Sequence, residues 1–207
     1  MTDPNYTALL VVIDRSGSMS NIREDMVGGI RSLISTQAAM PGRLTIDLWS
    51  FDDVVENEYT MASPDEVEVR LVPRGSTALY DAVGRSVVHF GELLEAMSED
   101  ERPGSVQVIV VTDGEENSSK EFSAADVKRL VTQQTTTYSW GFVFLGANQD
   151  AVLTGATLGF SPGSSLTYSA APAQVAAATD ALTHLISMRR AGALADFSDD
   201  DREAAGS

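Results

Sequence analysis

The stretch that decides the fold is Ala8-Leu9-Leu10-Val11-Val12-Ile13, followed directly by Asp14-Arg15-Ser16-Gly17-Ser18. The continuous apolar run is typical of a strand that is buried on both faces, as in parallel sheets. Such a strand has no room for an unpaired charge, so we expect Asp14 to mark its carboxyl end. Ligands of open α/β sheets bind in the crevice outside these strand ends. The loop offers the carboxylate of Asp14 and the hydroxyls of Ser16 and Ser18, hard oxygen donors that suit Mg²⁺ or Ca²⁺ better than zinc or copper.

The composition narrows the class of protein. A chain of 207 residues, 43% of them hydrophobic, can form one α/β domain with a packed core. The formal charge is −16, which argues against a nucleic-acid partner because phosphate binding needs clustered Lys and Arg. Zero Cys excludes a disulfide framework and a thiolate metal site. No apolar run approaches the about 20 residues that span a bilayer, and the N-terminus lacks a signal-peptide pattern, so we expect a cytoplasmic protein without a membrane segment.

Strand-like and helix-like segments alternate after the first strand. Apolar runs and alternating residues predict further strands at residues 44–51, 54–60, 106–111, 142–145 and 166–168. The first two of these should form a hairpin with a polar edge strand. Apolar residues at helical spacing predict helices that begin near residues 22, 77, 124, 149 and 172. The order predicts an α/β fold with a mostly parallel sheet, one antiparallel edge hairpin strand and helices on both faces.

Capping residues mark several of the predicted helix starts. Asn21 with Glu24 matches a capping box before the first helix, and Ser123 with Asp126 matches an N-cap pair before the helix near residue 124. Asn148 is expected to cap the short helix that follows it.

Both ends of the chain are expected to lie outside the packed domain. Residues 1–5 are predicted to be a disordered lead, and residues 193–207 form an acidic C-terminal tail that we expect to be solvated. Leu194 and Phe197 could dock this tail weakly. Residues 1–192, with the lead included, are therefore predicted to be a single domain.

Two later segments complement the Asp14 loop. Gly75-Ser76-Thr77-Ala78-Leu79 opens the second long helix, and Thr112-Asp113-Gly114 ends a strand as Ile13-Asp14 ends the first. Together the three segments resemble the von Willebrand factor A (vWA) domain family, in which they form the metal-ion-dependent adhesion site (MIDAS). The resemblance covers residues 6 to about 190, in the order of the family and with suitable spacing. It implies the Rossmann-like vWA fold.

The resemblance gives each of five residues a role. Ser16 and Ser18 resemble the hydroxyl pair that binds the metal directly, and Thr77 resembles the hydroxyl that ligates in the ligand-bound state. Asp14 and Asp113 resemble the carboxylates that act directly or through water. The implied cofactor is Mg²⁺, with Mn²⁺ or Ca²⁺ as alternatives. Because neutral hydroxyls leave the ion electrophilic, its open position would attract an Asp or Glu side chain of a partner protein.

Residues beside these segments have expected roles at the rim of the site. Glu115, Glu116 and Asn117 follow Asp113 and should form the rim of the site together with Arg15 and Arg74. They would select partners, or form a solvated rim.

Each part of the pattern also has an ordinary structural explanation. Asp14 could belong to a turn after a strand, and Thr77 could be the N-cap of its helix. Asp113-Gly114 is a common turn dipeptide. The combination of all of them, in this order, favours a metal site.

The sequence therefore predicts a metal-dependent protein-interaction module and not an enzyme. Family members suggest a MoxR-type AAA+ ATPase or another subunit of a bacterial or phage complex as partner. The enzyme alternative is a haloacid-dehalogenase-like phosphohydrolase, which needs a second Asp where Ser16 stands and a Lys after a later strand. A serine hydrolase would need a Gly-x-Ser-x-Gly elbow, which the Ser16 loop lacks. A scaffold with a silent metal site is a further alternative, against which the intact site residues argue.

Overall fold

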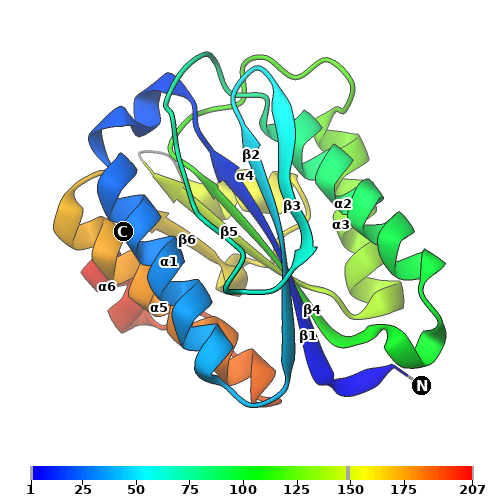
Figure 1. Cartoon of the computed structure of the whole chain (residues 1–207). Coiled ribbons are helices and arrows are strands. Elements are labelled where there is room, and N and C mark those ends of the chain that lie inside the picture. Colours follow the sequence, from blue (N-terminus) through cyan, green and yellow to red (C-terminus); the bar gives the residue numbers. More distant parts are fainter. Residues whose placement is uncertain (1, 148–149, 207) are drawn as a thin grey trace.

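A twisted, six-stranded sheet is the centre of the computed structural model, which describes residues 2–147 and 150–206 (Figure 1). Within this part of the chain the strand order is β3-β2-β1-β4-β5-β6. The strands are β1 (Asp3–Asp14), β2 (Arg43–Phe51), β3 (Val55–Ala62), β4 (Pro103–Thr112), β5 (Gly141–Ala147) and β6 (Ser165–Tyr168). The edge strand β3 pairs antiparallel with β2, and the other neighbours pair parallel. The predicted α/β fold with a single antiparallel edge strand is thereby confirmed.

Helices cover both faces of the sheet (Figure 1). One face carries α1 (Arg23–Ala39), α5 (Pro172–Arg190) and the short α6 (Asp199–Ala205). The other carries α2 (Leu79–Ala96), α3 (Ala124–Tyr138) and α4 (Ala151–Thr157). Short 3-10 helices lie at η1 (Gly17–Asn21), η2 (Glu99–Glu101) and η3 (Pro162–Ser164).

Side chains of β1 alternate between two hydrophobic cores. Leu9 and Val11 pack with the residues of α1 and α5, whereas Leu10 and Val12 pack with those of α2 and α3. All four are fully buried. This is why residues 8–13 of this strand are all apolar: a strand with helices on both faces has no solvent side.

The carboxyl ends of β1 and β4 meet at one edge of the sheet. The two strands are parallel neighbours, with Ile13 opposite Val111. The chain runs from β1 through α1 to β2 on one side, whereas β4 lies on the other side of β1. Asp14 is therefore level with Thr112, and Asp113 follows directly, at the point where the strand order changes direction, which is the usual ligand position in such sheets.

The N-terminal segment is ordered from Asp3 onward, in contrast to the predicted disordered lead. The backbone N–H of Asp3 donates to the carbonyl of Arg102 at 2.9 Å, which attaches the segment to the start of β4. The ring of Tyr6 is fully buried, and its hydroxyl lies 2.8 Å from Oγ1 of Thr45. These contacts outweigh the polar composition that suggested disorder.

The first helix starts differently from the prediction. Asn21 is the last residue of η1, and the N-cap of α1 is Ile22, which makes no side-chain capping bond. The predicted Asn21–Glu24 capping box is wrong because η1 runs directly into α1 and leaves Asn21 inside a helical turn. The Ser123–Asp126 capping box is confirmed. Asn148 lies outside the described residues.

The C-terminal acidic segment is folded, so the predicted solvated tail is wrong for its described part. Ser198 and Asp201 form a reciprocal capping box that starts α6. Phe197 and Ala205 are buried against the core that also holds α5, whereas Leu194 is fully exposed. The segment folds because these two apolar side chains and the box anchor its acidic helix. None of the helices in the described residues is long and apolar enough to cross a membrane.

Candidate metal centre

Asp14 is fully buried at the carboxyl end of β1, and both of its carboxylate oxygens accept hydrogen bonds. The backbone N–H of Ser16 donates to Oδ1 at 2.6 Å, and Thr112 Oγ1 donates to Oδ2 at 2.5 Å. The first bond folds the loop back on its own strand, and the second ties it to the end of β4. The carboxylate is thus held in one orientation.

Ser16 and Ser18 of the first loop connect Asp14 to Asp113 through a series of hydrogen bonds. Ser16 Oγ lies 3.0 Å from Ser18 Oγ, and Ser18 Oγ donates to Asp113 Oδ1 at 2.6 Å. Ser16 is almost completely buried, whereas Ser18 is exposed. The cluster therefore faces solvent on the side of Ser18.

Gly114 leaves a small space between three hydroxyl oxygens. A Cβ at this position would lie 2.8 Å from Thr77 Oγ1, 3.5 Å from Ser18 Oγ and 3.6 Å from Ser16 Oγ. The hydroxyls of three separate residues thus surround one point that no side chain fills. The structure brings all five predicted site residues into one cluster, the hydroxyls around this point and the carboxylates connected through them: Asp14, Ser16, Ser18, Thr77 and Asp113.

Burial disfavours the charged forms of both carboxylates. Burial raises the pKa of Asp14 to about 6, although hydrogen bonds from Thr112 and Ser16 act in the opposite direction. Burial likewise raises the pKa of Asp113 above its ordinary value, and the hydrogen bond from Ser18 offsets only part of this effect. A divalent cation between these groups would favour their charged forms.

The donor set fits a hard divalent cation. No group of three or more His, Cys, Asp or Glu that could hold a metal occurs in the described part of the chain, so a thiolate- or histidine-based centre has no residues to form it. The cluster instead combines carboxylates with hydroxyls, all of them oxygen donors of the kind that Mg²⁺ and Ca²⁺ prefer.

Arg15 does not line the rim as the sequence had suggested. It is buried, and its Nε and NH1 donate to Asp52 Oδ2 and Ser50 Oγ, both at 2.9 Å. It also forms an ion pair with Glu56. Arg74 turns the same way and donates from Nε to Asp52 Oδ2 at 2.7 Å. Both guanidinium groups thus lie against the β2–β3 turn and carboxylates other than those of the site.

Asp52 is a residue whose importance sequence reasoning missed, because Asp52-Asp53 matched an ordinary turn. It is fully buried, and the backbone N–H of Val54 donates to its Oδ1 at 2.7 Å. Burial raises the pKa of Asp52, but hydrogen bonds from Arg74, Val54 and Arg15 outweigh this effect and lower it. Its carbonyl accepts the N–H of Ala78 at 2.8 Å, so Asp52 connects the Arg15 loop with the segment that carries Thr77.

The connection after Asp113 is attached to the start of α2. Glu116, predicted at the rim, accepts the backbone N–H of Tyr80 at 3.0 Å through Oε2. Asp81 accepts the N–H groups of Lys120 and Phe122, each at 2.8 Å. The alternative role of Thr77 as N-cap of this helix is wrong, because the N-cap is Ala78 and a carboxylate from another loop binds the first turn. The hydroxyl of Thr77 is therefore not used to cap α2.

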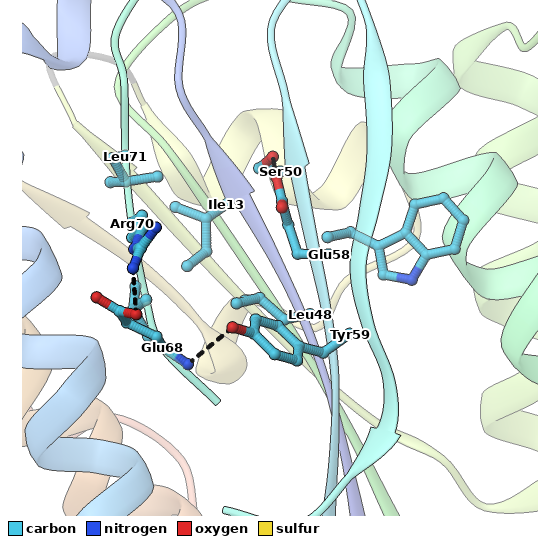
Figure 2. Close-up of a pocket in the computed structure, with 10 residues that line it drawn as sticks. Ile13, Leu48, Ser50, Glu58, Tyr59, Glu68, Arg70 and Leu71 are labelled. Carbon is cyan, nitrogen blue, oxygen red and sulfur yellow. Dashed lines mark hydrogen bonds and ion pairs between the residues drawn. The ribbon is translucent and has the colours of Figure 1, made fainter. Parts of the chain in front are cut away.

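A separate cavity of about 190 Å³ lies between β2, β3 and residues 68–71 (Figure 2). Its wall includes the hydroxyl of Tyr59, which accepts the N–H of Glu68 at 3.3 Å, and the Glu68–Arg70 ion pair. None of the five candidate ligands lines it. This cavity is therefore separate from the candidate metal centre at the strand ends.

Comparison with solved structures identifies the fold of this chain. A scan of family models finds no match to this sequence, and a search of curated proteins finds none either. Solved structures do match. The vWF domain of the type V pili tip protein Mfa5 from Porphyromonas gingivalis aligns over 88% of this chain and 95% of its own, with a TM-score of 0.64 and 11% identity.

This chain has the vWA fold. The von Willebrand factor type A protein from Catenulispora acidiphila aligns over 87% of this chain and 42% of its own, with a TM-score of 0.58 and 17% identity. Proximal thread matrix protein 1 from the mussel byssus aligns over 88% and 46%, with a TM-score of 0.63 and 15% identity. In that structure zinc occupies the MIDAS motif. This chain thus spans less than half the length of the last two proteins.

Proposed function

We propose that this chain is a metal-dependent protein-interaction module that binds an Asp or Glu side chain of a partner protein through Mg²⁺. The ion would be held by the five residues of the metal centre, Asp14, Ser16, Ser18, Thr77 and Asp113. The observation that carries the proposal is the convergence of three hydroxyl oxygens on one point beside Gly114, next to two buried carboxylates. Zinc in the MIDAS motif of the mussel protein supports a divalent cation at the equivalent place.

The carboxylates and the hydroxyls of the centre would have different roles in binding the ion. Asp14 and Asp113 balance the charge of a divalent ion, and carboxylates about 4 Å apart would otherwise repel each other by roughly 4 kcal/mol at an effective dielectric constant of 20. The neutral hydroxyls add oxygen donors without adding charge. When bound, Mg²⁺ supplies a Lewis-acidic position that accepts an external carboxylate. The exposed side of Ser18 is where that carboxylate would enter.

The negative charge of the chain does not prevent this binding mode. The formal charge is −16, yet exposed charges are screened beyond about 8 Å at physiological salt. Coordination to a local dication is a short-range interaction, so we expect it to dominate over the diffuse repulsion.

The environment of the centre favours binding over catalysis. Ser16 occupies the place where a haloacid-dehalogenase-like phosphohydrolase needs a general acid, and its hydroxyl is paired with Ser18. Both lysines, Lys120 and Lys128, are exposed, and His89 packs on Trp49 with ring centroids 5.4 Å apart. These groups do not contribute a base or a phosphate ligand to the cluster.

We propose a subunit of a bacterial or phage protein complex as the partner, with a MoxR-type AAA+ ATPase as one candidate, in a cytoplasmic setting. The pilus tip protein among the structural neighbours shows that the same fold also serves other settings. The chemistry of recognition is the same in each: a carboxylate of the partner completes the coordination of the ion.

The proposal can be tested by affinity capture. The immobilised chain is exposed to lysate of its host in Mg²⁺, in EDTA, and as Asp14→Ala in Mg²⁺. We expect partners in the first condition alone, and replacing Asp or Glu by Asn or Gln in the partner should abolish binding. Recovery of the same proteins in all three conditions would contradict the proposal.

An activity assay separates the module from an enzyme. We expect no turnover of p-nitrophenyl phosphate with Mg²⁺. Metal-dependent hydrolysis that Asp14→Asn abolishes would replace the interaction module by a phosphohydrolase.

A further inference from the structure

The hydroxyl of Thr77 is held differently from those of Ser16 and Ser18. The two serine hydroxyls lie 3.0 Å apart, and Ser18 is also bonded to Asp113. Thr77 Oγ1 forms no hydrogen bond with the part of the chain that the structure describes, although Thr77 is only 3% exposed. Its position therefore depends on the backbone of Thr77 and on the packing around this buried side chain.

Asn117 holds that backbone from one side through two hydrogen bonds. The N–H of Thr77 donates to Asn117 Oδ1 at 2.9 Å, and the N–H of Asn117 donates to the carbonyl of Thr77 at 3.0 Å. Both polar groups of the Thr77 backbone are thus bound by one residue that is 40 positions later in the chain.

Asn117 is also linked to a carboxylate of the metal centre. It lies in the connection that begins at Asp113, and Glu116 attaches this connection to the first turn of α2. On the other side, the N–H of Ala78 is held by the carbonyl of Asp52 at 2.8 Å. Thr77 therefore lies between the Asn117 connection and the segment of Asp52, and both hold its backbone. Of these contacts, the one made by the side chain of Asn117 can be removed by a substitution.

We propose that Asn117 is a positioning residue of the metal centre, whose side-chain amide holds Thr77 so that its hydroxyl faces the point beside Gly114. This inference rests on the proposed metal-binding function. Residues that orient metal ligands without touching the metal contribute about 10- to 100-fold to metal affinity. Asn117 is exposed, so its replacement should leave the core intact.

Isothermal titration with MgCl₂ and MnCl₂ tests the inference. We expect Asn117→Ala to weaken metal binding by about tenfold. The melting temperature in EDTA should fall only slightly, because the variant loses one hydrogen bond, to the N–H of Thr77. Asn21→Ala is the matched control: it removes an exposed Asn near the Ser18 loop that has no side-chain hydrogen bond in the described structure, and we expect no change.

A double-mutant cycle shows whether Asn117 acts through Thr77. Thr77→Ala alone should weaken binding, and adding Asn117→Ala to it should have no further effect, because the hydroxyl to be positioned is already absent. An equal loss in both backgrounds would overturn the inference, as would unchanged affinity of Asn117→Ala. Asn117→Asp keeps the acceptor atom and should retain binding, whereas a loss as large as that of alanine would also contradict the inference.

One further variant separates this inference from the proposed function. Asp14→Ala should abolish metal binding. If it binds metal like the original chain, the proposed metal centre fails. If it does not bind, but Asn117→Ala binds normally, only the positioning role fails.

Discussion

Thr112 donates a hydrogen bond of 2.5 Å from Oγ1 to Oδ2 of Asp14, although the two residues are 98 positions apart. They lie at the carboxyl ends of the neighbouring strands β4 and β1. The same hydroxyl accepts the N–H of Gly114 at 3.2 Å. One threonine therefore holds the carboxylate of the first loop and the turn that follows Asp113, and it lowers the pKa of Asp14 against the larger effect of burial.

The stability of the metal-free protein should fall as the pH rises through the titration range of Asp14. Its pKa is raised from 3.8 to about 6 in the folded state. Below about pH 4 both states keep the proton, so Asp14 has no effect. Above that pH the unfolded state loses its proton first, and the folded state loses about 3 kcal/mol of stability by the time the pH exceeds 6.

Urea unfolding in EDTA between about pH 4 and pH 8 measures this dependence. Asp14→Asn is the matched control, because its side chain does not titrate. We expect the free energy of unfolding of the two proteins to diverge with increasing pH, and parallel profiles would contradict the prediction.

Mg²⁺ or Mn²⁺ should raise the melting temperature of the protein. A ligand at 100 times its Kd stabilises the folded state by about 2.7 kcal/mol, which corresponds to roughly 5–10 °C for a chain of this size. Asp14→Ala should remove the gain. Differential scanning fluorimetry with metal and with EDTA is sufficient, and identical melting curves for the original chain would count against an occupied centre.

Gly114→Ala should weaken metal binding without unfolding the protein. The added Cβ would lie 2.8 Å from Thr77 Oγ1, inside the space between the hydroxyls. Gly114 does not have a positive φ, so alanine causes no backbone strain. We expect Mg²⁺ binding measured by calorimetry to be about tenfold weaker, an effect similar to the loss of a residue that orients a metal ligand. Gly28→Ala, which meets no atom within 4 Å in α1, should bind normally and be more stable by up to about 1 kcal/mol.

The sheet was predictable because its signals are local. The run before Asp14 is apolar at every position, and this pattern is typical of a strand covered on both faces. Asp14 and Asp113 each follow such a strand, so their meeting at one edge follows from parallel pairing alone. The sequence order of the segments that carry Ser16, Ser18 and Thr77 matches the family pattern.

The supports of the centre could not be read from the sequence because their partners are distant. Asp52 binds Arg15 across 37 positions, and Asn117 binds Thr77 across 40. In sequence, each resembles a turn or rim residue. The charge of Arg15 likewise suggested a solvent-exposed side chain. In the fold the side chain is buried, and its charge is compensated by the carboxylates of Asp52 and Glu56.

Asp52→Asn should destabilise the protein strongly, in contrast to a change at its exposed neighbour. The substitution leaves the buried guanidinium of Arg15 without the carboxylate that binds its Nε at 2.9 Å. Breaking a buried pair in this way costs about 3 kcal/mol. Glu56→Gln alters an ion pair whose carboxylate side chain is 47% exposed, and we expect at most about 1 kcal/mol. Urea unfolding of both variants measures the difference, and equal small effects would contradict the prediction.

Phe197→Ala should destabilise the protein, whereas Leu194→Ala should not. Phe197 is 6% exposed and packs with the α5 side of the core, and its N–H donates to the carbonyl of Gly163 at 2.9 Å. Its replacement by alanine should cost about 3 kcal/mol or more. Leu194 is fully exposed three residues earlier, so its truncation removes no buried surface. If residues 193–206 were only a solvated acidic tail, both variants would unfold at the same urea concentration as the original chain. Unequal midpoints are therefore the result expected for a segment that α6 and Phe197 anchor to the domain.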